Sequence, residues 1–156
     1  LVRGMPGEHE REPLARALTS ELRTVRPTEQ LAETLLEALR ILGGPDERRQ
    51  IERLVVAPAV PTQLRETAAS ALAHVGGSSS ERFWRSALGS ARRRWHQTHA
   101  KADASVLDRL IYSLGMSDQE ALLHTVTTDP TLPDRLRSAA RWWTTLPRHI
   151  LDSARS

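Results

Sequence analysis

The residues with the most evident chemical potential lie between Glu81 and Lys101, in a segment rich in arginine. On a helix with 100° per residue, its positive side chains share one flank, opposite an apolar arc that contains Trp84 and Trp95. Such a flank is either a solvated face or a stripe that binds a polyanion such as a nucleic-acid backbone. The candidate polyanion-binding residues are Arg82, Arg85, Arg92, Arg93 and His96. The apolar arc predicts that both tryptophans belong to the core.

The overall composition weakens the case for a polyanion partner. The net charge is +3, and Lys101 is the only lysine among 22 basic residues. Arginine is therefore abundant throughout the chain, so a local arginine cluster is less specific than it would be in a balanced sequence.

The histidines and hydroxyl residues form no recognisable catalytic motif. His96 and His99 are spaced i, i+3 and could face one metal ion, but no further ligand follows at a suitable spacing, and solvated surface histidines are the alternative. The chain has no cysteine, which excludes thiolate metal sites and thiol nucleophiles. Neither a Gly-rich phosphate loop nor a Gly-x-Ser-x-Gly or His-Glu-x-x-His motif occurs. We expect no metal, no cofactor and no enzymatic activity.

Two adjacent tryptophans, Trp142 and Trp143, stand near the C-terminal end of the sequence. Neighbouring positions on a helix diverge by about 100°, so we expect only one of them to point into the core. The other either covers the end of the domain beneath Ile150 and Leu151 or lies exposed as an anchor for a partner. Tryptophan and arginine are both favoured at the centres of protein interfaces, and Arg141 is adjacent.

Helical segments must position these residues. The chain of 156 residues is 39% hydrophobic and rich in Leu, Ala and Arg, which are good helix formers. No apolar run approaches the roughly 20 residues of a membrane span and no leader precedes the first segment, so we expect a cytoplasmic protein without a membrane partner. Helices are predicted at residues 10–25, 28–42, 46–57, 62–75, 80–98, 104–114, 118–128 and 134–145.

Helix start and stop signals accompany these segments. Prolines suit first-turn positions at Pro27, Pro45, Pro61 and Pro133. Glycines suit left-handed helix ends at Gly43-Gly44, Gly76-Gly77 and Gly115. Capping boxes are predicted at Ser78-x-x-Glu81 and Ser117-x-x-Glu120.

The segments repeat along the chain. Gly43 and Gly76 lie 33 residues apart (76 − 43), and each follows a helix with the same apolar spacing. A second comparison, at an offset of 72 (133 − 61), aligns Ile51, Leu54, Pro58, Val60, Pro61, Leu64, Arg65 and Ala68 with Leu123, Val126, Pro130, Leu132, Pro133, Leu136, Arg137 and Ala140. Prolines, an arginine and an alanine in one register indicate a true repeat, with two short units in each 72 residues.

The repeated motif resembles the second-helix signature of the HEAT family. It is present as Pro61-x-x-Leu64-Arg65-x-x-Ala68-Ala69-x-Ala71-Leu72, and again as Pro133-x-x-Leu136-Arg137 followed by Ala139-Ala140. The other two units depart from it, because residues 28–44 lack the Leu-Arg pair and residues 103–115 lack the proline. The resemblance implies an all-α fold, a right-handed α-solenoid of about four HEAT-like helix pairs in residues 10–156, after a flexible N-terminus at residues 1–9. The repeated Arg65 and Arg137 are expected to tie adjacent units together through carboxylate or carbonyl contacts.

In such a solenoid the second helix of each pair lines a concave face. The outward positions of these helices carry both signs of charge, which favours a protein partner over a uniform polyanion. We therefore expect a non-catalytic scaffold that binds another protein through Arg40, Glu66, Arg109, Arg141 and Trp142, on a face that also includes Glu37, Ser70, Ser113 and Ser138. Nucleic-acid backbone binding through residues 82–101 is the alternative, because some HEAT-like proteins bind DNA.

Overall fold

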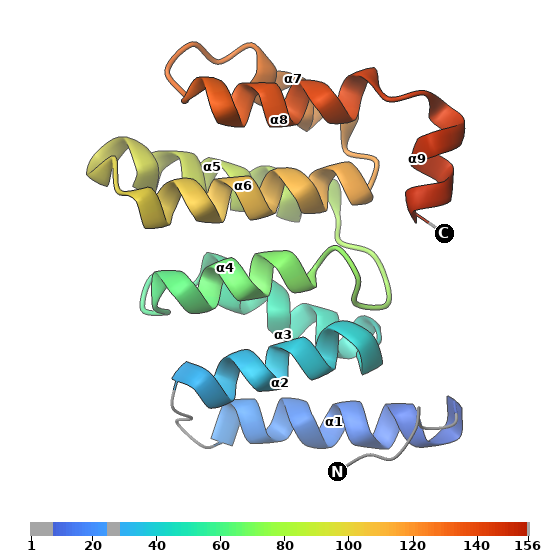
Figure 1. Ribbon diagram of the computed structural model, residues 1–156. Coiled ribbons are helices and arrows are strands. Elements are labelled where there is room, and N and C mark those ends of the chain that lie inside the picture. Colours follow the sequence, from blue (N-terminus) through green and yellow to red (C-terminus); the bar gives the residue numbers. More distant parts are fainter. Residues whose placement is uncertain (1–7, 25–28, 156) are drawn as a thin grey trace.

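The protein is helical throughout the part of the chain that its computed structural model describes, residues 8–24 and 29–155 (Figure 1). These ranges contain no strand. The helices are α1 (Glu8–Thr24), α2 (Glu29–Leu42), α3 (Pro45–Val56), α4 (Thr62–Ala71), α5 (Glu81–Thr98), α6 (Lys101–Met116), α7 (Glu120–Thr127), α8 (Asp134–Thr145) and α9 (Arg148–Arg155). The predicted all-α class is confirmed.

The eight predicted segments correspond to α1 through α8, with two differences at the ends of the chain. Helix α1 begins at Glu8, so residues 8 and 9 are helical and not part of a flexible N-terminus; residues 1–7 lie outside the described ranges. Helix α9 was not predicted. It follows Pro147, whose carbonyl accepts hydrogen bonds from the backbone N–H groups of Ile150 and Leu151.

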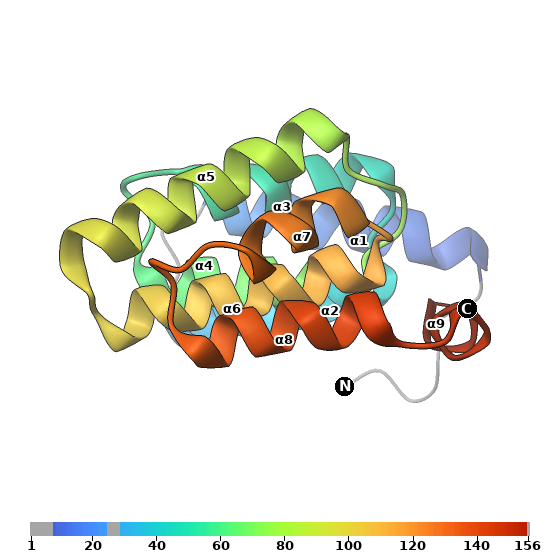
Figure 2. The ribbon, with the colours of Figure 1, turned by 90° about the horizontal axis from the view of Figure 1, so that it is seen from above.

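The helices pack in consecutive pairs. Helices α1 and α2, α3 and α4, α5 and α6, and α7 and α8 are in contact within each pair. From one pair to the next, α2 contacts α4, α4 contacts α6, and α6 contacts α8, while α1 contacts α3 and α3 contacts α5. Viewed from above, α2, α4, α6 and α8 lie along one side and α1, α3, α5 and α7 along the other (Figure 2). Helix α9 contacts α6.

The core follows the apolar stripes of the paired helices. All four helix pairs contribute to the largest fully buried side chains, although α1 itself contributes none. These side chains are Leu36, Leu39, Ile51, Leu72, Trp84, Leu107, Leu110, Ile111, Leu114, Leu123, Val126 and Leu136. Leu64 and Leu136 occupy the same position of the repeat and both pack on this core, but Leu136 is fully buried and Leu64 only partly.

The 72-residue repeat has a matching backbone. Pro61 precedes α4 with φ −55° and ψ 143°, and Pro133 precedes α8 with φ −56° and ψ 144°. Both are helix N-caps and not first-turn residues as predicted, whereas Pro45 is the first residue of α3. Each N-cap carbonyl accepts from the N–H four residues later, that of Arg65 at 3.0 Å and that of Arg137 at 3.2 Å. Pro27 lies outside the described ranges.

The predicted glycine roles are mostly wrong. Among the described glycines only Gly77 has a positive φ, at 84°. Gly76 is required by a close approach between two backbones, because its N–H donates to Gly43 O at 2.9 Å and an added Cβ would lie 2.8 Å from that oxygen. Gly115 lies inside α6, which continues to Met116.

Both predicted capping boxes are also wrong. Ser80, not Ser78, caps α5, with its hydroxyl accepting from Phe83 N at 3.0 Å. Helix α7 follows Gln119 without a side-chain cap. The capping contact that sequence reasoning missed is at α3, where the carboxylate of Glu47 accepts from Gly44 N at 3.0 Å.

None of the helices in the described ranges is both long enough and apolar enough to cross a lipid bilayer.

Candidate functional site

An open cleft of about 400 Å³ runs across α2, α4 and α6. Three of the five predicted partner-binding residues line it, one from each helix: Arg40, Glu66 and Arg109. The remaining lining residues are Glu37, Thr67, Ser70, His74 and Tyr112. The structure therefore brings together side chains that are far apart in the sequence, and we call this site the α2–α4–α6 cleft.

The charges of the cleft are paired with each other. Arg40 Nε lies 3.1 Å from Glu37 Oε2 on the same helix, and Arg109 Nε lies 3.4 Å from Glu66 Oε1 on the neighbouring helix. The four side chains are between 29% and 54% exposed to solvent. Because ion pairs at such exposure contribute about 0.2–1 kcal/mol, charged groups of a partner could exchange with them at little cost.

His74 and Tyr112 connect the end of α4 to α6 in the same cleft. Their Nε2 and hydroxyl atoms lie 3.2 Å apart and their ring centroids 5.9 Å apart. Partial burial lowers the pKa of His74, and the positive charge of Arg40 lowers it further, against an opposing effect of Glu37. The neutral imidazole is therefore favoured, and in the tautomer protonated on Nδ1 its Nε2 can accept a hydrogen bond from the tyrosine hydroxyl.

An aromatic row continues from the cleft to α8. Tyr112 packs against Trp143 with centroids 5.8 Å apart, and Trp143 against Trp142 with centroids 5.0 Å apart. Trp143 is 8% exposed and Trp142 54% exposed, so one tryptophan points inward as predicted. The other is exposed and does not cover the end of the domain; it is Trp143 that shares a cavity with Leu151.

The other predicted partner-binding residues lie on α8, outside the lining of the cleft. Arg141 is exposed beside Trp142 and makes no ion pair with any described residue. Ser138 is also exposed. Ser113 was expected on the same face but is fully buried, and its hydroxyl donates to Ala69 O. The prediction that Ser113 belongs to the exposed face is wrong, because its side chain points to the backbone of α4.

The structure divides the predicted polyanion stripe of α5. Arg85 pairs with Glu81 at 2.6 Å, and Arg92 pairs with Asp129 in the α7–α8 connection. His96 Nε2 lies 3.3 Å from Thr131 Oγ1 in that connection. Of the three arginines that are exposed, Arg82 and Arg93 have no ion pair to any described residue, so the five side chains do not act as one free cationic surface.

Asp129, the carboxylate partner of Arg92, is stabilised in its charged form. Burial alone would raise the pKa of Asp129, but hydrogen bonds from Thr131 and from Arg92, and the positive charge of Arg92, lower it below its ordinary value. Arg92 thus fixes α5 to the α7–α8 connection. The opposite arc of α5 is core as predicted at Trp84, which is 1% exposed, whereas Trp95 is only partly buried.

Arg65 and Arg137, the repeated arginines, have different partners. Arg65 Nε donates to Val60 O at 3.1 Å, and its guanidinium lies 4.0 Å from Asp103 of α6, with both side chains buried. It therefore ties two adjacent pairs, as expected. Arg137 pairs with Asp134 within α8, so the same expectation is wrong for Arg137, whose Nε is buried without a hydrogen-bond partner among the described residues.

No three His, Asp or Glu side chains in the described ranges are arranged to hold a metal ion. His99 ends α5 in the left-handed conformation, with φ 50°, and its ring centroid lies 4.5 Å from that of Trp95.

No protein-family model, curated protein or solved structure matches this chain. Its function is therefore inferred from its own residues.

Proposed function

We propose that the chain is a HEAT-like scaffold that binds another protein through the face of α2, α4, α6 and α8. In this proposal α1 to α8 form four stacked pairs of a right-handed α-solenoid. The proposal is supported by the contacts between consecutive pairs, by the matching backbone at Pro61 and Pro133, and by the Arg65–Asp103 contact between adjacent pairs.

The observation that carries the binding function is the composition of that face. The α2–α4–α6 cleft holds two weak ion pairs, and an aromatic row leads from it to the exposed Trp142 and Arg141. Charges of both signs beside exposed tryptophan, tyrosine and arginine are typical of protein interfaces, where such residues act as anchors. A phosphate backbone would instead require an excess of positive charge.

The alternative, nucleic-acid backbone binding through α5, has less support. Arg92 has a mostly buried carboxylate partner, and Arg85 has only an exposed pair with Glu81. Arg82, Arg93 and Lys101 remain as exposed cations without an ion pair to any described residue. Three or four phosphate contacts would give a dependence of affinity on salt with a slope of about −3 to −4 for log K against log [salt]. Duplex or single-stranded DNA that binds with such a slope would favour this alternative.

A displayed library of random peptides can test the protein-binding proposal. We expect enriched sequences whose binding is reduced at least tenfold by Trp142→Ala or Arg109→Ala, because both side chains are exposed on the proposed face. Arg93→Ala is the matched control, since it removes an exposed arginine from the other side of the molecule and should leave binding unchanged. Enriched peptides that bind all three variants equally, or a library without enrichment, would contradict the proposal.

A further inference from the structure

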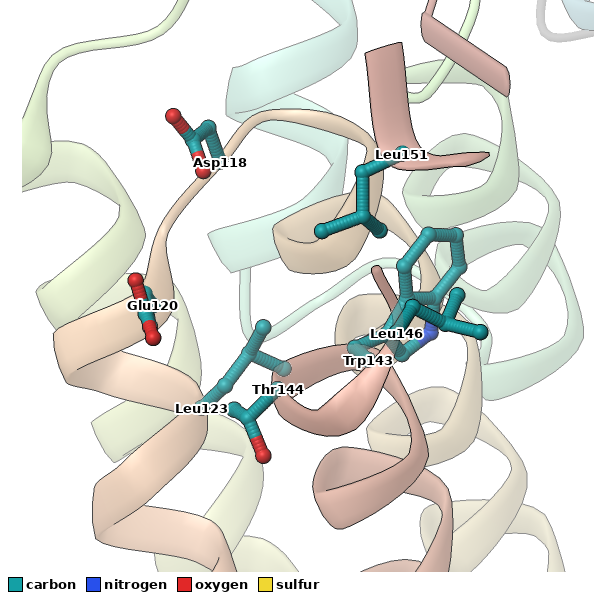
Figure 3. A pocket seen from close by; sticks show the side chains of 7 residues that line it. All are labelled: Asp118, Glu120, Leu123, Trp143, Thr144, Leu146 and Leu151. Carbon is teal, nitrogen blue, oxygen red and sulfur yellow. The ribbon is translucent and has the colours of Figure 1, made fainter. Parts of the chain in front are cut away.

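A small cavity lies between α7, α8 and α9, away from the α2–α4–α6 cleft (Figure 3). Its apolar wall consists of Leu123, Trp143, Leu146 and Leu151, contributed by all three helices and by the α8–α9 connection. Asp118 and Glu120, from the α6–α7 turn and the start of α7, stand on the other side of the opening, as Figure 3 shows. Four apolar side chains thus line one side of the cavity, Thr144 adds a hydroxyl group to its lining, and two carboxylates stand at its mouth.

The volume of the cavity limits what it can hold. It measures about 150 Å³. Sites for whole small molecules span about 300–1,000 Å³, whereas an apolar cavity of about 150 Å³ accepts a group the size of benzene. The cavity therefore has room for a chain of four or five heavy atoms and not for a complete cofactor.

The charge around the mouth selects among such groups. Glu120 makes no ion pair with any described residue. A wider hollow beside the cavity shares Asp118 and Glu120 and is also lined by Glu81, which pairs with Arg85, and by His124. Although the whole chain carries a net charge of +3, carboxylates predominate at this mouth. A neutral alkyl group would satisfy only the interior, and an anion would be repelled.

We propose that this cavity binds an alkylammonium group. Its hydrocarbon stem would pack against Leu123, Leu146 and Leu151, while the ammonium would stay at the mouth beside Asp118 and Glu120, in the way that lysine keeps its stem on apolar surface and its charge in water. Two sources share this chemistry, the lysine side chain of a protein and a free alkylamine. The proposal does not depend on the function of the α2–α4–α6 cleft.

An NMR titration tests the proposal. The protein is titrated with n-butylammonium and, separately, with n-butanol, and the leucine methyl and tryptophan indole signals are followed. We expect saturable shifts at Leu123, Leu151 and Trp143, and an affinity for the ammonium on the order of fivefold higher than for the alcohol, as one exposed ion pair would provide. Glu120→Gln and Asp118→Asn should each reduce this preference. Glu21→Gln is the control, because it removes an exposed carboxylate from α1, distant from the cavity.

N-acetyl-lysine methylamide distinguishes the two sources. If it shifts the same signals as n-butylammonium, the cavity accepts the lysine side chain of a protein; if only n-butylammonium does, the cavity accepts a free alkylamine and not a lysine within a chain. The proposal is overturned if no saturable shift occurs at the cavity residues, if the alcohol binds as well as the ammonium, or if both carboxylate variants keep the full preference. Unchanged amide spectra of the unliganded variants would show that they remain folded.

Discussion

Trp143 of α8 packs directly on Gly115 of α6, where no side chain separates the two helices. A Cβ on Gly115 would lie 2.1 Å from Trp143 Cδ2, which is far inside van der Waals contact. Gly43, located 72 positions earlier (115 − 43), is also crowded, with Leu39 O at 2.6 Å and Val75 Cγ2 at 2.9 Å from its added Cβ. In both places the absence of a side chain, and not a left-handed backbone, explains the glycine.

Gly115→Ala should therefore destabilise the protein. The added methyl group must displace the indole or separate α6 from α8, and such overpacking costs about 1–3 kcal/mol. Urea unfolding followed by circular dichroism measures the change. Gly89→Ala is the matched control, because its Cβ would meet only the mobile end of Arg93 at 3.4 Å. Since alanine is the better helix former, that variant should be more stable by about 0.5–1 kcal/mol; equal loss in both variants would contradict the explanation.

The partial burial of His74, close to the positive charge of Arg40, should make stability depend on pH. The pKa of His74 is lower in the folded protein than its ordinary value, so the unfolded chain takes up this proton first as the pH falls. The free energy of unfolding should then decrease as the pH is lowered from about 7.5, through the ordinary histidine pKa of about 6.5, to about 5. His74→Gln should show a smaller decrease over the same range in urea unfolding. Identical decreases in both proteins would refute the assignment to His74.

Between elements, a single buried arginine holds the connection from α4 to α5. Arg48 of α3 donates to Ser79 Oγ at 2.8 Å and to Val75 O at 3.0 Å, and its guanidinium lies 5.9 Å from the centroid of Trp84. Ser79 in turn donates to Glu52 Oε1 at 2.7 Å. Three segments thus meet at one side chain, which is only 3% exposed as a residue.

Arg48→Met should cost about 3 kcal/mol of stability. Methionine fills much of the same volume but leaves the buried carbonyl of Val75 and the hydroxyl of Ser79 without their hydrogen bonds from the guanidinium, and buried polar groups that lose a charged partner carry such a penalty. The neighbouring Arg49→Met is the control, because Arg49 is 73% exposed and its contact with Asp46 is 3.8 Å long. It should change stability by no more than about 0.5 kcal/mol. Thermal unfolding of the two variants under the same conditions decides between these expectations.

The elements themselves follow from local sequence, which is why they could be predicted. The 3.6-residue spacing of apolar side chains is enough to place α1 to α8, because a buried stripe is a property of each segment alone. Helix α9 has only eight residues and few apolar side chains, so its apolar stripe is too short to be recognised as a helix from the sequence. The prediction of the α5 cap was wrong for a related reason. Three consecutive serines are equivalent in the sequence, and Arg48 binds the middle one, Ser79.

The candidate site was predictable only where neighbouring helices repeat the same outward position. Arg40, Glu66 and Arg109 could be grouped because each lies on the same helix of successive pairs. Arg48 could not be distinguished from Arg49, and the pairing of Arg92 with Asp129 joins residues 37 positions apart. Such contacts join residues that are far apart in the sequence, and no local spacing of residue types predicts them.

In the molecule as a whole, the described helices contact each other within each pair and between consecutive pairs. Helix α1 contacts α2 and α3, and α2 also contacts α4. At the other end of the molecule, α8 contacts α6 and α7 (Figure 1). In a stack with only nearest-neighbour interfaces, a local perturbation should weaken its own pair and the adjacent pair most, because no core connects the two ends directly. A globular bundle with one shared core would instead transmit the loss to every helix.

Hydrogen exchange of two variants can distinguish these cases. Gly115→Ala perturbs the α6–α8 contact, so exchange should accelerate most in α5 to α8 and least in α1 and α2. Ala15→Gly perturbs the other end, where Ala15 is fully buried in α1, and glycine in a helix costs about 1 kcal/mol relative to alanine. Its effect should be the reverse, greatest in α1 and α2. If both variants accelerate exchange uniformly, the helices unfold as one cooperative unit, and the linear stack on which the proposed scaffold depends would be refuted.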